Sequence, residues 1–313
     1  MILNPLKPSD YQRLAGFFEK QKYRLCVYSL SSLIVWTNEI FQPCGTVIGD
    51  ETLIAGTEYN AAHADKRHLF LPVSSAREYS PEELLDFAMQ SGFQTYEFVP
   101  DEYIEKHGRA RVENLFEITE QPACYDYVYL REDLATLKGN RYAKKRNLIN
   151  QFTREFADKR IQVEKITSSV VPDCADFLEK WCEERKCGED PEGLSCEKQA
   201  VLNSFEHIDH LEMRGILLRI DGVVTAVGIG SRLTGDMGAL HFEKAFAGIK
   251  GLYQFFDRLC AQQLFEDCIY INKESDMGNP GLAKAKKSYH PIMILKSYKL
   301  RLRGTDWGTA TVP

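Results

Sequence analysis

The order of apolar and polar positions predicts two series of secondary-structure elements along the chain. In the first half, two alternating stretches flank Gly49-Asp50 and indicate a β-hairpin. Ser80-Pro81, followed by two glutamates, is a helix-start signal, and Gly92 marks the end of that helix. The elements expected here are a hairpin at 41–49 and 51–59, a strand at 68–73, a helix at 81–90 and a strand at 93–99.

The second half repeats this order. Asp221-Gly222 lies between two apolar stretches and is a strong hairpin signal. Because both halves read as hairpin, strand, helix and strand, we expect a duplicated α/β unit with two mixed sheets flanked by helices. The elements expected here are a hairpin at 213–220 and 223–231, a strand at 239–244, a helix at 250–265, a strand at 268–273, a short helix at 280–288 and a final strand at 291–300.

A basic amphipathic helix is expected between the halves, at residues 140–156. Its apolar residues Tyr142, Ile149 and Phe152 recur at helical spacing. We expect the two halves to pack about this helix. The predicted division is an N-terminal domain over 1–137, a basic linker helix over 138–160 and a C-terminal domain over 161–313.

Composition and charge narrow the choice of partners. The chain has 313 residues, 44% of them hydrophobic, and a formal net charge of −6, which is typical of a folded protein in water. Positive charge is concentrated in residues 138–160 and 284–303, which together carry +13 and leave −19 on the other 270 residues. An anionic partner is therefore expected to bind at these two segments. The alternative is that both segments are solvated faces of helices and strands.

Expectations about location and metals follow from apolar runs and cysteines. Residues 25–38 form a run of 14 residues without Asp, Glu, Lys or Arg. A membrane-spanning helix needs roughly 18 apolar residues, so no transmembrane segment is expected.

Export is not expected either, because Pro5 and Pro8 interrupt the place where a signal peptide has its apolar core. The nine cysteines are therefore expected to be reduced thiols in the cytoplasm. The spacing of Cys182, Cys187 and Cys196 lacks the short pairs of zinc sites, so no metal is expected.

A glycine-containing turn connects the expected strand at 239–244 to the next helix. Gly248, Lys250 and Gly251 lie in this turn and Tyr253 follows it, so free backbone N–H groups, a helix dipole and a lysine charge meet at one place. A phosphate or carboxylate is expected to bind there. The matching helix of the first half begins with two glutamates, which oppose an anion. The alternative is an ordinary strand-to-helix connection.

Charged side chains also follow the strand expected at 268–273. Glu274 and Asp276 come directly after it, and Lys284 and Lys287 lie in the short helix beyond them. Ligands bind at the carboxyl ends of strands in open α/β sheets, so these side chains are expected to line one pocket. The alternative is that Asp276 caps a loop and that the lysines face solvent.

Three stretches carry a resemblance to a known family. Residues 137–147 (LKGNRYAKKRN), 272–282 (NKESDMGNPGL) and 29–36 (SLSSLIVW) resemble DUF2156, a bacterial family similar to the C-terminal synthase region of phosphatidylglycerol lysyltransferases. The resemblance extends from about Lys7 to Leu302. It implies a tandem GNAT (acyl-CoA N-acyltransferase) fold. It also implies a transferase that moves an acyl or aminoacyl group from acyl-CoA or aminoacyl-tRNA to an amine or hydroxyl of a small molecule, a peptide or a lipid headgroup.

The candidate residues take roles in such a transfer. A carboxylate, Glu243 or Glu274, is expected to assist deprotonation of the acceptor, and Tyr289 is a candidate proton donor. The alternative function is a catalytically silent GNAT-like module that binds an anionic ligand or RNA for regulation. The residues expected to hold the donor are Gly248, Lys250, Gly251 and Tyr253 at the turn, Arg141, Lys144 and Lys145 on the basic helix, and Lys284 and Lys287 on the other side of the pocket.

Overall fold

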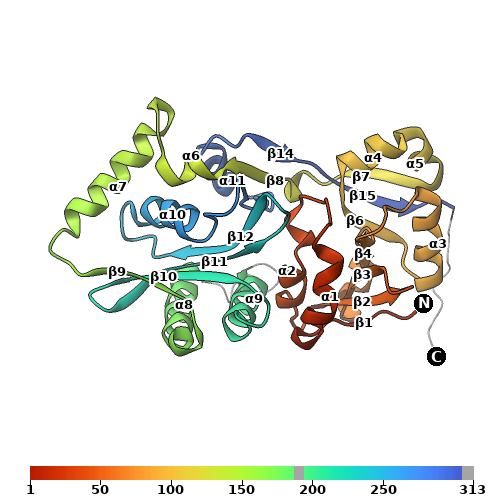
Figure 1. Cartoon of the computed structure of the whole chain (residues 1–313), viewed down its shortest axis with the longest axis horizontal. Helices are drawn as coiled ribbons and strands as arrows, with labels where there is room; N and C mark the ends of the chain where they lie inside the picture. Colours follow the sequence, from red (N-terminus) through yellow and green to blue (C-terminus); the bar gives the residue numbers. More distant parts are fainter. Residues whose placement is uncertain (187–193, 305–313) are drawn as a thin grey trace.

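Two sheets lie side by side in the computed structural model, which describes residues 1–186 and 194–304 (Figure 1). The first sheet consists, in spatial order, of β1 (Asn4–Pro5), β2 (Phe41–Ile48), β3 (Thr52–Tyr59), β4 (His68–Leu69), β6 (Thr95–Pro100), β15 (Ser297–Leu302) and β7 (Phe116–Glu120), and β5 (Val73–Ser74) also pairs with β3. The second consists of β14 (Met293–Leu295), β8 (Asp126–Leu130), β13 (Tyr270–Asn272), β12 (Met237–Ala245), β11 (Val223–Arg232), β10 (Arg214–Ile220) and β9 (Ile161–Lys165).

Both sheets are mixed, since β4 runs parallel to β6 and β12 runs parallel to β13. The α-helices are α1 (Tyr11–Phe18), α2 (Leu30–Val35), α3 (Pro81–Ser91), α4 (Asp101–His107), α5 (Arg109–Leu115), α6 (Arg131–Thr136), α7 (Ala143–Glu155), α8 (Val171–Arg185), α9 (Leu194–Glu206), α10 (Leu252–Gln263) and α11 (Pro280–Lys287). The 3₁₀ helices are η1 (Pro8–Asp10), η2 (Cys26–Tyr28), η3 (Ala61–Lys66), η4 (Pro122–Cys124), η5 (Asn140–Tyr142) and η6 (Ser168–Val170). The predicted fold class is confirmed: two mixed sheets flanked by helices in a tandem GNAT-like fold.

Local signals in the sequence correspond to the turns and caps of the structure. The hairpin β2–β3 turns at Gly49 and Asp50, which have positive φ angles of 57°. The hairpin β10–β11 turns at Asp221-Gly222, with φ angles of 50° and 86°. Two consecutive residues with positive φ match the right-handed twist of the flanking strands, so both predicted hairpins are confirmed.

Helix α3 begins and ends where its flanking residues predict. The Ser80 hydroxyl accepts a hydrogen bond from the Glu83 backbone N–H, and the Glu83 carboxylate accepts one from the Ser80 N–H. This reciprocal pair is a capping box. Gly92 follows the helix with a left-handed φ of 72°, a conformation that glycine adopts without steric cost.

The second sheet is covered on both faces, and its two faces contribute to different cores. Helices α8 and α9 lie against one face, and α10 lies against the other (Figure 1). The α8 and α9 side is continuous with the core of the first half, because Phe177 and Phe205 pack in the same cluster as Leu33 and Ile34 of α2. The two halves therefore share one core through α2, α8 and α9.

The position of α7 corrects one expectation. This helix packs on α10 at the end of the molecule that is remote from the first sheet (Figure 1). Its buried residues Ile149 and Phe152 belong to the core between α10 and the second sheet. The prediction that the halves pack about this helix is therefore wrong, because its apolar face is fully used within the second half.

The two sheets exchange strands. The strand expected at 291–300 is two strands, so that prediction is wrong: β14 pairs with β8 in the second sheet, and β15 lies between β6 and β7 in the first. Lys296 separates them, where the chain crosses from one sheet to the other. The strand β8 makes the opposite crossing and joins the second sheet beside β13. The division into domains at 137 and 160 stays a prediction, and each sheet includes a strand from beyond it.

Candidate functional site

The candidate site lies where the parallel strands β12 and β13 diverge. Their pairing ends at Ala239 opposite Asn272, and β12 continues for another six residues. Such a point at the carboxyl ends of parallel strands is a common ligand site in α/β proteins. Glu243 extends from the part of β12 that continues beyond the pairing with β13, and Lys273 and Glu274 follow β13 directly.

A buried ion cluster occupies one side of this point. The Lys273 Nζ lies 2.9 Å from Glu243 Oε2 and 2.5 Å from Asp257 Oδ1, and Asp257 comes from α10. The three side chains are only 13%, 15% and 4% exposed, respectively, so they interact in a region of low dielectric. Buried charges persist only when paired, and here one ammonium neutralises part of two carboxylates.

The cluster shifts the proton affinity of its members. Burial raises the pKa of Glu243 to about 7, although the charge of Lys273 acts in the opposite direction. Burial alone favours neutral Lys273, but the charges of Asp257 and Glu243 raise its pKa well above the usual value. At neutral pH, Lys273 is therefore a cation, while Glu243 exchanges a proton in the range where general bases work best.

Tyr289 borders the same cluster. Its ring centroid lies 5.4 Å from Lys273 Nζ and 3.8 Å from the Nζ of Lys145, which reaches over from α7. Burial, and then the charge of Asp257, raise the pKa of the Tyr289 hydroxyl well above its usual value. Tyr289 therefore keeps its proton at neutral pH. The structure thus brings together Glu243, Tyr289 and Lys145 of the predicted residues.

Glu274 lies on the other side, in a chain of hydrogen bonds. Its Oε1 is 2.8 Å from His241 Nδ1, and His241 Nε2 is 2.8 Å from the Ser231 hydroxyl. A carboxylate only accepts, so Nδ1 carries the imidazole proton and Nε2 accepts from Ser231 when the ring is neutral. Ser231 in turn lies 2.9 Å from the hydroxyl of Ser29, which caps α2 in the first half.

A β-bulge places His241 in this chain. Phe242 pairs with Ile229 and Leu240 pairs with Gly230, so His241 between them is the extra residue on β12. A bulge redirects a side chain out of the regular alternation of the strand.

Lys286 of α11 contacts the backbone next to both the ion cluster and the Glu274 hydrogen-bond chain. Its Nζ donates to the backbone carbonyl of Lys273 and, at 3.1 Å, to that of Glu274. Burial lowers the pKa of Lys286, with the charge of Glu274 opposing this effect.

A second buried carboxylate, Asp126, lies next to the end of β13. It accepts hydrogen bonds of 2.7 Å from Asn272 Nδ2 and from the backbone N–H of Cys26. Burial raises the pKa of Asp126 to about 6.

The glycine turn is partly covered. Gly251 precedes α10 with a φ of +83°, and a Cβ placed on it would lie 2.2 Å from the carbonyl oxygen of Leu148 in α7. Gly248 and Lys250 are exposed. The Tyr253 hydroxyl lies 3.5 Å from Trp181 Nε1, which donates to it. The turn therefore offers its exposed part to a ligand, and its last residue is in contact with α7.

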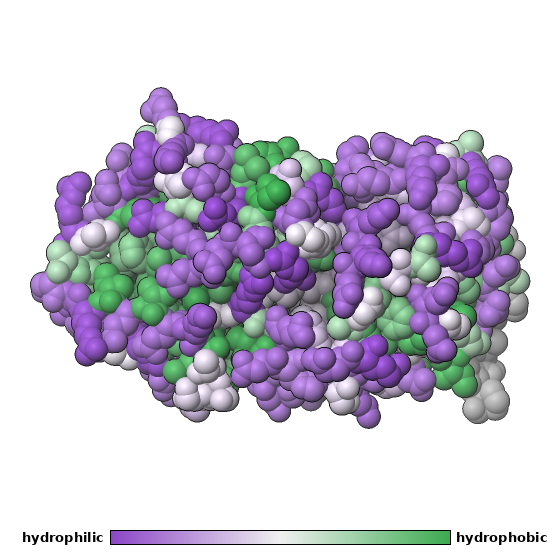
Figure 2. Space-filling model, in the orientation of Figure 1, coloured by the Kyte–Doolittle hydropathy of each residue, from purple (hydrophilic) through white to green (hydrophobic). Residues whose placement is uncertain are grey.

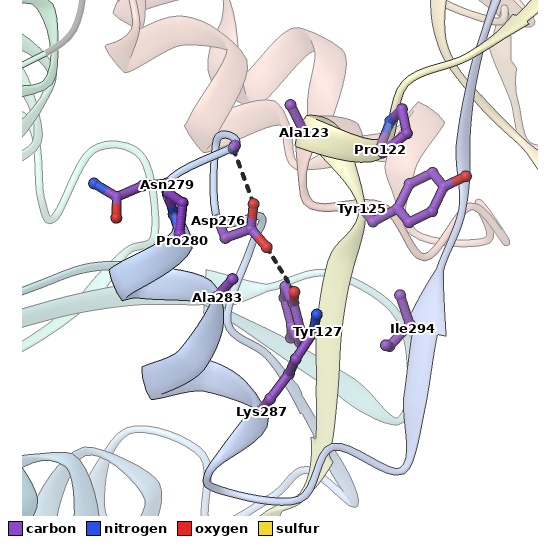
Figure 3. A pocket seen from close by; sticks show the side chains of 11 residues that line it. Pro122, Ala123, Tyr125, Tyr127, Asp276, Asn279, Pro280, Ala283, Lys287 and Ile294 are labelled. Atoms are coloured by element: carbon purple, nitrogen blue, oxygen red, sulfur yellow. Dashed lines mark hydrogen bonds between the residues drawn. The ribbon is translucent and has the colours of Figure 1, made fainter.

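The predicted basic residues are spread over several environments. Arg141 forms an ion pair of 2.7 Å with Asp133, and Lys145 donates to the Ser288 hydroxyl at 2.6 Å. Lys144 and Lys284 are exposed. Lys287 lines a pocket of about 310 Å³ beside α11 that also contains Asp276 (Figure 3). Only Lys145 among them reaches the ion cluster.

Several functional candidates were not predicted from the sequence. Asp257, Lys273, Lys286, Asp126 and His241 received no role, although Asp257 carries a recognisable signal. It is a charged residue within the apolar stripe of α10, beside the buried Phe256. The others depend on strand order and on the bulge, which a single sequence does not reveal.

The described residues bear on the metal, cysteine and membrane expectations. Among residues 1–186 and 194–304, no group of three or more His, Cys, Asp or Glu side chains is placed to hold a metal ion. Cys187, part of the spacing considered for zinc, lies outside the described residues. Cys182 is disulfide-bonded, so the expectation of reduced thiols is wrong for this residue. Within the same residues, no helix has the length and apolar character needed to cross a membrane.

Solved structures resemble this chain along almost its whole length. A conserved protein of unknown function from Bacteroides thetaiotaomicron VPI-5482 is 29% identical, with a TM-score of 0.85 over 96% of this chain and 99% of that one. The C-terminal DUF2156 domain of a putative lysylphosphatidylglycerol synthetase from Agrobacterium fabrum is 14% identical, with a TM-score of 0.64 over 95% and 92%. L-PGS from Bacillus licheniformis is 15% identical, with a TM-score of 0.62 over 94% and 92%.

A comparison with curated proteins gives no match. The family model described as "Phosphatidylglycerol lysyltransferase, C-terminal" matches residues 59–301, which include both sides of the candidate site. That range is well over half of the chain, and the predicted resemblance is confirmed. The chain therefore belongs to the phosphatidylglycerol lysyltransferase C-terminal family, also called DUF2156, a family of GNAT-like aminoacyltransferase domains.

Proposed function

We propose that the protein transfers an aminoacyl group from aminoacyl-tRNA to a hydroxyl or amine acceptor. The observation that carries this proposal is the ion cluster at the divergence of β12 and β13. It combines a carboxylate that titrates near neutral pH, Glu243, with a neighbouring phenol that keeps its proton, Tyr289. A base and an acid of this kind are what acyl transfer requires.

The chemistry follows from these protonation states. Ionised Glu243 accepts the proton of the acceptor hydroxyl or amine as this group attacks the ester carbonyl carbon of the donor. A new C–O or C–N bond forms, and the ester bond to the ribose oxygen breaks. Tyr289 gives its proton to that oxygen and regains one from protonated Glu243, so no net charge is created. The ammonium groups of Lys273 and Lys145 lie beside Tyr289 and would stabilise the negative charge that develops.

Two observations favour aminoacyl-tRNA over acyl-CoA as the donor. At Gly251 there is no room even for a methyl group, so the end of the turn nearest to α10 is closed by α7. The segment at 138–160 carries eight basic and two acidic residues, which suits a polyanion. The family also points to an aminoacyl donor.

One observation favours the alternative, a silent module that binds an anionic ligand or RNA. The charged groups of the cluster are already paired with each other, since Lys273 contacts both Glu243 and Asp257. A closed cluster of this kind is also stable without any substrate. Turnover distinguishes the two functions.

The transfer test uses the intact protein with labelled aminoacyl-tRNAs or acyl-CoA, and with vesicles containing phosphatidylglycerol or with soluble amines as acceptors. We expect label to move from aminoacyl-tRNA to an acceptor. Glu243→Gln should lower the rate by about 10²- to 10⁴-fold, the usual contribution of a general base. Glu117→Gln, an exposed carboxylate on β7, is the matched control and should leave the rate unchanged. Binding of tRNA without any transfer would favour the silent module.

The donor surface is tested separately by tRNA binding at several salt concentrations. Replacing Arg141, Lys144 and Lys145 together by Gln should weaken binding and flatten its salt dependence, because each lost phosphate contact removes nearly one unit of slope. Arg141 and Lys145 also have partners within the protein. Lys144→Gln alone therefore serves as a variant with an intact fold. An unchanged affinity and slope in the triple variant would rule out this segment as the donor surface.

A further inference from the structure

The pocket beside α11 is not explained by the proposed transfer. It lies between β8, β14 and the loop that leads into α11, and its volume is about 310 Å³ (Figure 3). Tyr125 and Tyr127 form one wall, Ile294 and Ala283 supply apolar surface, and Asp276 and Lys287 bring opposite charges. Pockets for small molecules have roughly 300–1,000 Å³, so this one suits a small ligand.

Asp276 is the feature that decides what kind of ligand fits. Its residue is only 9% exposed, so the carboxylate is nine-tenths buried and faces the pocket. One oxygen accepts a 2.6 Å hydrogen bond from the Tyr127 hydroxyl, and the other accepts one of 2.9 Å from the Gly278 N–H. Within the described residues, no Lys, Arg or His side chain forms an ion pair with it.

A buried carboxylate without a cation is unusual. Two hydrogen bonds from neutral donors compensate only part of the lost hydration of a charged group. Each carboxylate oxygen can accept a further hydrogen bond, and the pocket is the open space next to it. A cation with N–H donors would complete the hydrogen bonds of this carboxylate and balance its charge.

The aromatic wall favours an ammonium group in that place. Tyr127 lies in β8, Tyr125 directly precedes this strand, and both line the pocket (Figure 3). Aromatic faces attract ammonium groups by cation–π interaction, with roughly 0.5–2 kcal/mol depending on desolvation. Lys287, on the last turn of α11, is exposed and brings a positive charge to the pocket.

We propose that this pocket binds a small zwitterion, with its primary ammonium group at Asp276 and its anionic group toward Lys287. This chemistry is shared by a free amino acid and by an amine-bearing phosphate headgroup. The part that such a ligand plays in transfer rests on the proposed function, whereas its binding requires no donor.

The pocket has a surface context that suits a ligand entering from solvent. Ile292 and Ile294 are 41% and 47% exposed. Figure 2 shows an apolar patch over β14, surrounded by hydrophilic side chains. A ligand with an aliphatic part can rest against this patch while its charged ends reach the pocket.

Binding is measured by calorimetry on the intact protein, with L-lysine and phosphoethanolamine as probes. Glycerol 3-phosphate lacks the ammonium group, and ethylamine lacks the anionic group. We expect saturable binding of at least one zwitterion and at least tenfold weaker binding of glycerol 3-phosphate. Preference for L-lysine would assign the pocket to a free amino acid, and preference for phosphoethanolamine would assign it to a headgroup.

Two variants separate recognition from structure. In Asp276→Asn the amide oxygen still accepts from Gly278, so the turn is retained while the charge is lost. We expect at least tenfold weaker binding of the zwitterion. Lys287→Gln, at an exposed position, should weaken binding of zwitterions and leave ethylamine unaffected. Asp209→Asn, an exposed aspartate, is the matched control and should bind like the wild type.

Either of two results overturns the proposal. One is the absence of saturable binding of both zwitterions to the wild type. The other is equal affinity of the wild type and Asp276→Asn, which would leave Asp276 as a turn-capping residue only. Both results are independent of transferase activity, so they do not coincide with failure of the proposed function.

Discussion

Glu243 provides a direct test of the buried ion cluster through the pH dependence of stability. Its pKa is about 7 in the folded protein, against the ordinary value of 4.5 for a glutamate. Because the folded state holds the proton more tightly, Glu243 leaves stability unaffected below pH 4.5 and reduces it progressively as the pH rises to 7. The difference of about 2.5 units corresponds to about 3 kcal/mol once the group is fully ionised. Glu243→Gln has no such proton to lose.

The assay is denaturant unfolding of the wild type and Glu243→Gln at pH 5 and pH 8. Between these pH values, the free energy of unfolding of the wild type should fall by about 2 to 3 kcal/mol more than that of the variant. Asp126 also titrates abnormally, but it is present in both proteins, so its contribution cancels in the difference. Glu117→Gln should follow the wild type. Parallel pH profiles for the wild type and Glu243→Gln would show that Glu243 titrates normally, and the assignment of this residue as a base at neutral pH would fail.

Other perturbations test the packing around the site. Gly251→Ala should lower the free energy of urea unfolding by at least about 2 kcal/mol, because residue 251 has a left-handed conformation and the new Cβ would lie 2.2 Å from an α7 carbonyl oxygen. Gly248→Ala is the control: a Cβ there has nothing within 4 Å, so the free energy of unfolding should change by less than about 1 kcal/mol. Lys273→Met should lower the free energy of unfolding by about 3–5 kcal/mol, because two buried carboxylates lose their cation. Lys299→Met breaks a more exposed ion pair and should lower it by less than about 1 kcal/mol. Similar losses in the two variants would contradict the buried cluster. Ser231→Ala removes the hydroxyl that donates to the buried imidazole of His241, and the free energy of unfolding from thermal melts should fall by about 1–3 kcal/mol. An unchanged free energy of unfolding would mean that this hydrogen-bond chain adds nothing to stability.

The sequence was most informative where a few neighbouring residues determine the backbone. Gly49-Asp50 and Asp221-Gly222 specify hairpins because the required positive φ angles are available to few residue types. Ser80 and Gly92 define the ends of α3 for the same local reason. Such signals, with the apolar pattern, predicted the repeated element order and the two mixed sheets, whereas the tandem GNAT fold was predicted from the family resemblance.

Interactions between distant residues were not predictable in this way. Lys273 meets Glu243 only because β13 lies beside β12 in parallel, and this order depends on the whole sheet. His241 points toward Ser231 because of a bulge, which leaves no mark in the spacing of apolar residues. Asp126 and Cys26 are 100 residues apart and come together across the two halves. The arrangement of the candidate site therefore depends on tertiary contacts, whereas the positions of the helices and strands follow largely from local sequence preferences.

The exchange of strands between the sheets has a consequence for biosynthesis. Strand β15 inserts between β6 and β7, although nearly 180 residues of chain separate it from β7. While the ribosome is still making the second half, β6 and β7 lack their common neighbour and expose unpaired backbone groups. Non-local pairing of this kind slows folding and leaves open strand edges that promote association with other chains. We expect the nascent first half to need protection until about residue 302 has emerged, and both halves then to acquire their final structure together.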